Sequence, residues 1–222
     1  MDVKKLFTSG SCFFCQLKTN DAWCKDCEKD FIRNASRCPC CGQKNAEKHL
    51  CGACLNKKTF ITTTEVVFSY DYPANELIKA FKFNNRHELS AVFAERLANK
   101  LKKKTEMLPS VLIPVPLHKK RQMIRGYNQS LEIARHLGKH LGIEINPSLC
   151  SRIKNTDPQS TLPVKTRRKN VQGAFAINTQ RIPKHIAIID DVITTGSTIN
   201  ELARLLKNAG CQRIDVWAIA RA

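Results

Sequence analysis

Short apolar runs alternate with longer segments of helical periodicity along most of the chain. Runs that predict strands lie at residues 60–70, 111–116, 143–145, 186–189 and 214–220, and the first of these fits a hairpin equally well. Apolar residues at helical spacing predict helices over 73–81, 88–103, 128–142 and 198–209. Strands that alternate with helices in this way predict a parallel α/β sheet with right-handed connections.

The first 58 residues lack this pattern and hold too few apolar residues for a hydrophobic core of their own. Eight of their cysteines form CxxC pairs, namely Cys12/Cys15, Cys24/Cys27, Cys38/Cys41 and Cys51/Cys54. Two CxxC turns supply the four thiolates of a tetrahedral zinc site. The sequence therefore predicts a zinc-binding module at 1–58, with up to two Zn²⁺ ions that supply its folding energy, followed by a second domain at 59–222.

The spacing of the cysteines leaves their pairing open. Two sequential sites, an interleaved cross-brace and the loss of one site are all compatible with it. Cys40 is not expected to be a ligand unless it replaces a neighbour, and Cys150 and Cys211 are expected to be small core residues. A redox role for a CxxC pair is disfavoured, because redox motifs seldom come in fours.

The cysteines also bear on the cellular compartment. A secreted disulfide scaffold would carry a signal peptide, but the opening residues contain no apolar segment of that kind. No later apolar run reaches transmembrane length. We therefore expect reduced cysteines in a cytoplasmic protein without a transmembrane segment.

A candidate ligand site follows the apolar run at 186–189. Asp190 and Asp191 are expected at the end of that strand, and a turn of small hydroxylated residues leads into a helix in which Thr198 and Glu201 have capping-box spacing. Unpaired N–H groups at a helix N-terminus favour a phosphate. The carboxylates suit sugar hydroxyls or a hydrated Mg²⁺. A ribose 5-phosphate satisfies both halves, whereas the alternative is an ordinary strand that ends in solvated aspartates.

The stretch DDVITTGST at 190–198 resembles the signature with which type I phosphoribosyltransferases bind phosphoribosyl pyrophosphate (PRPP), together with Mg²⁺. The resemblance implies that Asp190 and Asp191 hold the ribose hydroxyls and are the catalytic residues if the protein is an enzyme. It also implies a phosphate loop made of Thr194, Thr195, Gly196, Ser197 and Thr198.

PRPP carries a pyrophosphate, so its site needs a second group of donors. In type I phosphoribosyltransferases the connection after the first strand holds the pyrophosphate, which here corresponds to the segment at 116–130. Arg121 and Arg125 offer forked donors, and Gly126 permits close approach of the backbone. His118, Lys119 and Lys120 add positive charge, and the alternative is a solvated basic turn.

Further motifs narrow the resemblance. They are PVP followed by RGYNQS, R-x-x-x-T-x-x-Q at 152–159, R-x-x-N-V-x-G-A-F at 167–175, and Lys82-Phe83 with Arg86 nearby. With the cysteine-rich start, these motifs resemble the ComF family of natural-competence proteins in order and through nearly the whole chain. The resemblance implies a type I phosphoribosyltransferase-like parallel sheet flanked by helices, with a small N-terminal zinc-binding module.

The ComF resemblance also implies a role in genetic transformation. It places the protein on the cytoplasmic side of DNA uptake, peripheral to the uptake machinery at the inner membrane. The implied partners are PRPP, incoming single-stranded DNA, and other DNA-uptake and recombination proteins.

The formal net charge of +18 favours polyanionic partners, although surface lysines kept only for solubility are the alternative. The polar and basic segment 151–169 predicts a long mobile loop. Candidate stacking residues for DNA bases are Trp23, Phe13 and Phe14. Candidate contacts to DNA are Lys79, Lys82, Arg86, Lys119, Lys120, Arg167, Arg168 and Lys169.

Two functional classes therefore remain open. A binding module would hold single-stranded DNA, with PRPP as a ligand or signal. A catalytically active phosphoribosyltransferase would pass through an oxocarbenium-like transition state, with the loop at 152–168 closed over PRPP to exclude water. No segment of the sequence identifies the base or amine that such an enzyme would use as acceptor.

Overall fold

A computed structural model describes residues 10–31, 36–45, 49–56, 59–104, 107–155 and 170–222. Its centre is a five-stranded parallel sheet with the strand order β1-β7-β6-β2-β3. The strands are β1 (Thr63–Ser69), β2 (Val111–Pro114), β3 (Glu144–Ile145), β6 (His185–Ile193) and β7 (Arg213–Arg221). The predicted parallel sheet is confirmed.

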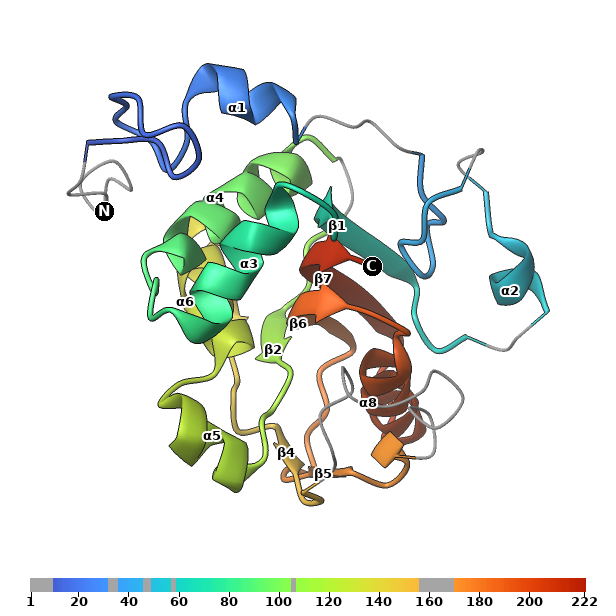
Figure 1. Ribbon diagram of the computed structural model, residues 1–222. Helices are drawn as coiled ribbons and strands as arrows, with labels where there is room; N and C mark the ends of the chain where they lie inside the picture. The colour runs from blue at the N-terminus through green and yellow to red at the C-terminus, as the bar shows by residue number, and fades with distance from the viewer. Residues whose placement is uncertain (1–9, 32–35, 46–48, 57–58, 105–106, 156–169) are drawn as a thin grey trace.

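Helices cover both faces of this sheet (Figure 1). One face carries α3 (Ala74–Phe83), α4 (Leu89–Lys102) and α6 (Gln129–Leu141), and the other face carries α8 (Ser197–Asn208). Alternate residues of β6 serve the two cores: Ala187 and Ile189 join the first, and Ile186 and Ile188 join the second. All four are fully buried, because a parallel strand between two helical layers has no solvent face.

Two short elements lie where the sequence predicts only irregular chain. Residues 119–125 form the helix α5 (Lys119–Arg125), and Cys150–Arg152 forms β4, which pairs antiparallel with β5 (Phe175–Ile177). The predicted loop therefore begins later than residue 151, and residues 156–169 lie outside the described part of the chain. Three-residue strands are too short to show a periodicity, so their pairing depends on contacts that are distant in sequence.

The strand β6 continues past both aspartates to Ile193, so the predicted strand end at residue 189 is wrong. On one side β6 pairs with β2 only as far as Ile189, opposite Pro114. On the other side it stays paired with β7, with Asp190 opposite Ala218 and Ile193 opposite Arg221. Prolines 114 and 116 have no N–H to donate, so β2 ends while β6 continues along β7.

The predicted capping box at the start of α8 is also wrong. The helix begins at Ser197 after Gly196, whose φ of +75° is left-handed, and no side chain caps it. Glu201 instead accepts a hydrogen bond from the backbone N–H of Gly173 at 2.8 Å and binds the guanidinium of Arg204. The first turn of α8 therefore begins without a capping side chain on its N-cap residue.

The cysteine-rich region forms two knuckles. The first knuckle (residues 10–31) contains the short helix α1 (Lys25–Lys29), and the second knuckle (residues 36–45 and 49–56) contains α2 (Gly52–Leu55). The first knuckle packs on α4, where Trp23 is 2% exposed and belongs to the same core as α3 and α4. The Trp23 indole N–H donates to Glu28 at 2.7 Å, and Arg96 of α4 pairs with Glu28 and lies over the Trp23 ring. Apolar side chains of the first knuckle are therefore packed against the core of the sheet domain.

The second knuckle lies beside β1 on the opposite side of the molecule from α3 (Figure 1). The backbone N–H of Thr64 donates to the Pro39 carbonyl at 2.7 Å, and the Thr64 hydroxyl donates to the Cys40 carbonyl. A Cβ added at Gly42 would lie 2.9 Å from a Thr64 methyl group, so only glycine permits this close contact. Among the residues described, no helix combines the length and apolar character needed to cross a lipid bilayer.

Candidate functional site

The two adjacent aspartates lie in the part of β6 that extends beyond β2. The Asp190 carboxylate accepts hydrogen bonds from the Ser130 hydroxyl at 3.1 Å and from the Asp191 backbone N–H at 2.9 Å. Asp191 accepts from the Val192 N–H at 2.6 Å, and its other oxygen lies 3.0 Å from the Lys82 ammonium. The ends of α3, the start of α6 and β6 thus build one acidic site.

The environment of Asp190 disfavours its charge. Burial and the neighbouring charge of Asp191 raise the pKa of Asp190 to about 7, although Lys82 and the Ser130 hydroxyl act in the opposite direction. Asp190 therefore exchanges between its acid and carboxylate forms near neutral pH. In its ionised form such a carboxyl group accepts hydrogen bonds from ligand hydroxyls at both oxygens and with the help of its charge, whereas the acid form keeps only part of that acceptor capacity.

Lys82 has a different position from the one that the sequence predicts. We expected it on a DNA-binding surface, but its side chain is 19% exposed and its ammonium pairs with Asp191. The sequence does not predict this contact or that of Ser130, which lies in the first turn of α6. Proximity in sequence gives no sign of either contact, because α3, α6 and β6 meet only after the sheet has formed.

The predicted phosphate loop connects β6 to α8. Thr195 and Ser197 hydroxyl groups lie 2.9 Å apart, and the Ser197 N–H donates to the Thr195 hydroxyl at 3.4 Å. Asn200 of α8 donates its side-chain amide to the Gly196 carbonyl at 2.9 Å, which fixes the turn. Thr194 and Thr198 complete the loop at its two ends. Hydroxyls and N–H groups at a helix N-terminus form a suitable site for a phosphate.

The expected pyrophosphate segment is helical. His118 caps α5 by accepting from the Lys120 N–H at 3.3 Å, and Gly126 ends it with a left-handed φ of +76°. The Arg125 guanidinium lies over the Phe83 ring at 5.5 Å and 3.4 Å from the Gln129 side-chain oxygen. The predicted residues of this segment therefore share one short helix beside the end of α3.

Two arginines come close enough to influence each other near this helix. Burial lowers the pKa of Arg152 to about 10; the charge of Arg121 lowers it further, whereas that of Asp190 raises it. Arg152 belongs to β4 and lies over the Phe175 ring at 5.6 Å. The two positive charges repel each other, and an anion bound between them would relieve that repulsion.

The remaining basic residues differ in how they are held. Lys79 pairs with Glu76 at 2.8 Å on the surface, and Arg86 pairs with Glu88 and lies over Phe13. Lys119 and Lys120 are exposed on α5. Arg167, Arg168 and Lys169 lie outside the described residues.

Of the three aromatic residues proposed for base stacking, one is buried and two are half-buried. Trp23 is buried in the shared core, and Phe13 and Phe14 are half-buried against it, so the expectation for Trp23 is wrong. The exposed aromatic residues of the described chain are instead Tyr72 and Phe83, and Phe83 is 65% exposed. Trp23 is buried because its knuckle has no core of its own and uses the surface of α4.

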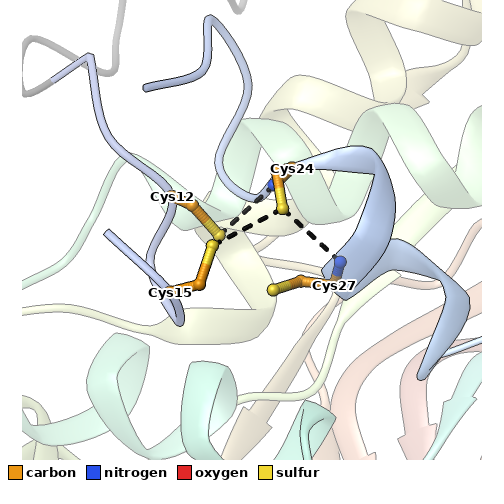
Figure 2. Close-up of side chains that lie close together, drawn as sticks. All are labelled: Cys12, Cys15, Cys24 and Cys27. Carbon is orange, nitrogen blue, oxygen red and sulfur yellow. Dashed lines mark hydrogen bonds between the residues drawn. The ribbon is translucent and has the colours of Figure 1, made fainter. Parts of the chain in front are cut away.

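The eight cysteines form two clusters of four, and the ligand atoms within each cluster lie within 4.8 Å of one another. Figure 2 shows the sulfur atoms of Cys12, Cys15, Cys24 and Cys27 gathered at one point. The second cluster consists of Cys38, Cys41, Cys51 and Cys54. The pairing is therefore sequential, and the cross-brace that the spacing left open is not what the chain forms.

The chemistry of both clusters fits zinc. Backbone N–H groups donate to the sulfur atoms of Cys12 and Cys38, each at 3.3 Å. Burial raises the pKa of these two thiols, but such N–H groups outweigh it and lower both values to about 6. Burial and the neighbouring sulfur atoms instead raise the pKa of Cys27 and Cys54 in the same clusters, so the metal charge is needed to ionise all four thiols. Thiolates are the form that binds metal, and four of them are the ligand set that zinc prefers in structural sites.

The other cysteines behave as predicted. Cys40 is buried and its thiol lies 3.1 Å from the Thr59 hydroxyl, outside both clusters. Cys150 and Cys211 are buried in the core beneath α8.

Comparison with known proteins agrees with this architecture. Residues 129–222 match the model of the phosphoribosyl transferase domain, and residues 3–55 match the double zinc ribbon domain. One solved structure, a purine phosphoribosyltransferase from Pyrococcus horikoshii, aligns at 19% identity over 59% of this chain and 80% of its own, with a TM-score of 0.35. Together with the parallel sheet, the two family matches define a phosphoribosyltransferase-like α/β domain with an N-terminal double zinc ribbon.

Relatives along the whole chain define the family more closely. Competence protein F of Haemophilus influenzae is 36% identical over 90% of both chains. DNA utilization protein YhgH of Salmonella typhimurium is 32% identical over 97% of this chain and 99% of its own. Competence protein ComFC of Streptococcus pneumoniae is 29% identical over 89% of this chain and 87% of its own. The protein belongs to the ComF family of competence proteins.

We expect the purified protein to hold about two zinc ions per chain, one in each cluster. Replacement of Cys12, Cys15, Cys24 and Cys27 by serine should remove one ion and leave the other bound, because the two ligand sets are separate. Native mass spectrometry measures this directly. Loss of both ions in a variant whose sheet domain remains folded would contradict the sequential pairing.

Proposed function

We propose that this protein acts in DNA uptake during natural transformation and binds both PRPP and single-stranded DNA. The observation that carries the proposal is the placement of Asp190 and Asp191 near the end of the strand that leads directly into the TTGST loop at 194–198. This arrangement places carboxylates that can accept hydrogen bonds from ligand hydroxyls a few residues from N–H and hydroxyl groups that can donate to a phosphate. The names of its relatives, which refer to competence and DNA utilization, support the biological setting.

The site residues divide into parts that match the chemistry of PRPP. The carboxylates of Asp190 and Asp191 would accept hydrogen bonds from the ribose hydroxyls, and the loop at 194–198 would hold the 5-phosphate. Arg121, Arg125 and the Gly126 backbone would hold the pyrophosphate. When bound, Mg²⁺ supplies positive charge to the phosphate oxygens.

A surface for single-stranded DNA adjoins this site. Lys119 and Lys120 are exposed on α5, and the Phe83 ring is exposed beside Arg125 of the same helix. Lys79, one α-helical turn before Phe83, adds charge on α3. Basic side chains around an exposed aromatic ring are typical of sequence-tolerant binding to single strands, because every base has a flat face.

A phosphoribosyl transfer reaction is the second candidate. The acidic pair and the phosphate loop are present together, and the exposed Phe83 ring directly follows Lys82, which reaches Asp191. A flat acceptor base could stack there next to the ribose. Consumption of PRPP in the presence of bases, amines or single-stranded DNA tests this candidate, and its absence favours the binding module.

We place the protein in the cytoplasm, on the receiving side of the DNA-uptake machinery at the inner membrane. Its partners there would include other DNA-uptake and recombination proteins. The proposal is supported by the thiol-rich zinc ribbon, which suits a reducing compartment, and by the net charge of +18.

Replacement of both Asp190 and Asp191 by asparagine should weaken Mg-PRPP binding about 100-fold or more. Each ionised acceptor contributes about 1.5–3 kcal/mol to a hydrogen bond, and the amide keeps the shape without the charge. Calorimetry with Mg-PRPP measures the affinity, and the melting temperature checks the fold. Unchanged affinity in the folded variant would place the ligand elsewhere.

The affinity for Mg-PRPP should fall as the pH falls through about 7, because protonated Asp190 loses the charge that strengthens its hydrogen bonds from ribose hydroxyls and keeps only part of its acceptor capacity. Lys82→Met removes the positive charge that favours ionised carboxylates, so its pH profile should move to higher pH. Lys82→Arg is the matched control and should keep the parent profile. The ligand's own titration is common to all variants, so identical profiles for the parent and Lys82→Met would contradict this role.

Binding of single-stranded DNA should be sequence-tolerant and should weaken steeply between about 50 and 200 mM salt. Phe83→Ala should cost about 1–3 kcal/mol of binding free energy, whereas Phe83→Tyr should retain it. Reversal of Lys119 and Lys120 to glutamate should remove most of the binding. The same reversal of Lys102 and Lys103, at the end of α4, is the control and should have little effect in fluorescence anisotropy. Equal effects of the two reversals would show that the charge acts without a defined surface.

A further inference from the structure

Arg221, near the end of β7, connects two parts of the molecule that are far apart in sequence. Its Nε donates to the carbonyl oxygen of Cys41 at 3.0 Å. Its Nη1 donates to the carbonyl of Ile193 at 3.1 Å and also to that of Thr194. One guanidinium thus holds the backbone of a second-cluster cysteine and the backbone at the start of the phosphate loop.

The two backbone segments that Arg221 contacts belong to two different predicted ligand sites. Cys41 is one of the four cysteines of the second cluster, and Thr194 is the first residue of the phosphate loop. Arg221 reaches both because the register of the sheet places it directly opposite Ile193. The backbone N–H of Ala222 also donates to the Ile193 carbonyl, at 3.0 Å. The loop therefore begins from a strand end that β7 and Arg221 hold from one side.

Several hydrogen bonds attach the second knuckle to the sheet domain, so a change in the knuckle's structure can reach the sheet. Besides Arg221, it is attached through the two Thr64 contacts to Pro39 and Cys40, and Arg37 donates to the Ser69 hydroxyl at 2.7 Å. Four thiolates around one Zn²⁺ carry a net charge of −2, which attracts the guanidinium. Without the metal, the four thiol groups lose their common ligand, and the Cys41 carbonyl is positioned only by hydrogen bonds of the surrounding backbone and of Arg221.

The first knuckle provides an internal comparison. Its described contacts to the sheet domain lie on the opposite helical layer from α8. They include the pairing of Glu28 with Arg96 of α4, the packing of Trp23 and Phe31 on Phe68 of β1, and Arg86 over the Phe13 ring. Both clusters have the same four-cysteine chemistry, but Arg221 contacts only the second.

We propose that Arg221 is a positioning residue that couples metal occupancy of the second zinc cluster to the geometry of the phosphate loop. Zinc binding at Cys38, Cys41, Cys51 and Cys54 then favours the loop arrangement that binds an anion, and anion binding favours retention of that zinc ion, since such coupling is reciprocal. The inference rests on the proposed PRPP site for its ligand. It does not require that the protein be an enzyme.

The test uses the full chain and two readouts. The first is hydrogen exchange of the backbone amides at 194–198, which needs no ligand. The second is the affinity for Mg-PRPP, with inorganic phosphate as a simpler probe. The variants are Cys51→Ser with Cys54→Ser for the second cluster, Cys24→Ser with Cys27→Ser for the first, and Arg221→Gln. Circular dichroism and the remaining zinc content establish that each variant keeps its sheet domain.

We expect loop exchange to accelerate in the second-cluster variant and in Arg221→Gln, and not in the first-cluster variant. The PRPP affinity should fall about tenfold in the same two variants, which corresponds to one lost coupling of about 1.4 kcal/mol. Combining Arg221→Gln with the second-cluster change should add little, because both break the same connection. Arg221→Lys should resemble Arg221→Gln, since a lysine cannot donate to three carbonyls in the geometry of the fork.

Equal loop exchange in the two cluster variants would overturn the inference, as would additive effects of Arg221→Gln and the second-cluster change. If the second-cluster variant loses its fold, Arg221→Gln alone decides, because it keeps all eight cysteines. Failure of the parent to bind PRPP would instead overturn the proposed function. The hydrogen-exchange comparison would still test the coupling in that case.

Discussion

The pairing of β6 with β7 beyond the end of β2 is the constraint on which the rest of the site depends. Because β2 stops at Pro114, the last four residues of β6 keep a neighbour on one side only. That open side exposes Asp190 and Asp191 to Lys82 and Ser130, which come from helices on the same face. The closed side brings Arg221 opposite Ile193, so one strand extension creates the acidic site and anchors the phosphate loop.

Like charges lie close together in this site, and their repulsion destabilises the protein when no ligand is bound. Two neighbouring carboxylates repel each other, and the pKa of Asp190 rises to about 7 as a result of burial and of that repulsion. Arg121 and Arg152 repel each other in the same region. A ligand that brings hydroxyl donors to the first pair and negative charge to the second relieves both. Perturbed pKa values that arise from burial and a specific neighbouring charge cluster at functional sites.

Zinc and the sheet share the task of folding the cysteine-rich region. Each knuckle is too small to bury a core, and the four thiols of each cluster are placed to replace that core with metal–ligand bonds when zinc binds. What apolar surface the knuckles have is buried against the sheet domain, as Trp23 shows on α4. The zinc ribbon therefore behaves as part of one structure, and its second knuckle lies within hydrogen-bonding reach of the residue that holds the phosphate loop.

The sequence by itself determined the parallel α/β class, the approximate limits of the main helices, the cysteine pairs and the loop at 194–198, because periodicity and short spacings are local properties. Tertiary structure alone decided that β6 extends beyond the end of β2, that Trp23 is buried and that Lys82 pairs with Asp191. It also joined Arg221 to Cys41, which lies 180 positions away in the chain. These contacts depend on strand order and register, which involve free energies summed over the whole sheet and leave no trace in any short stretch of sequence.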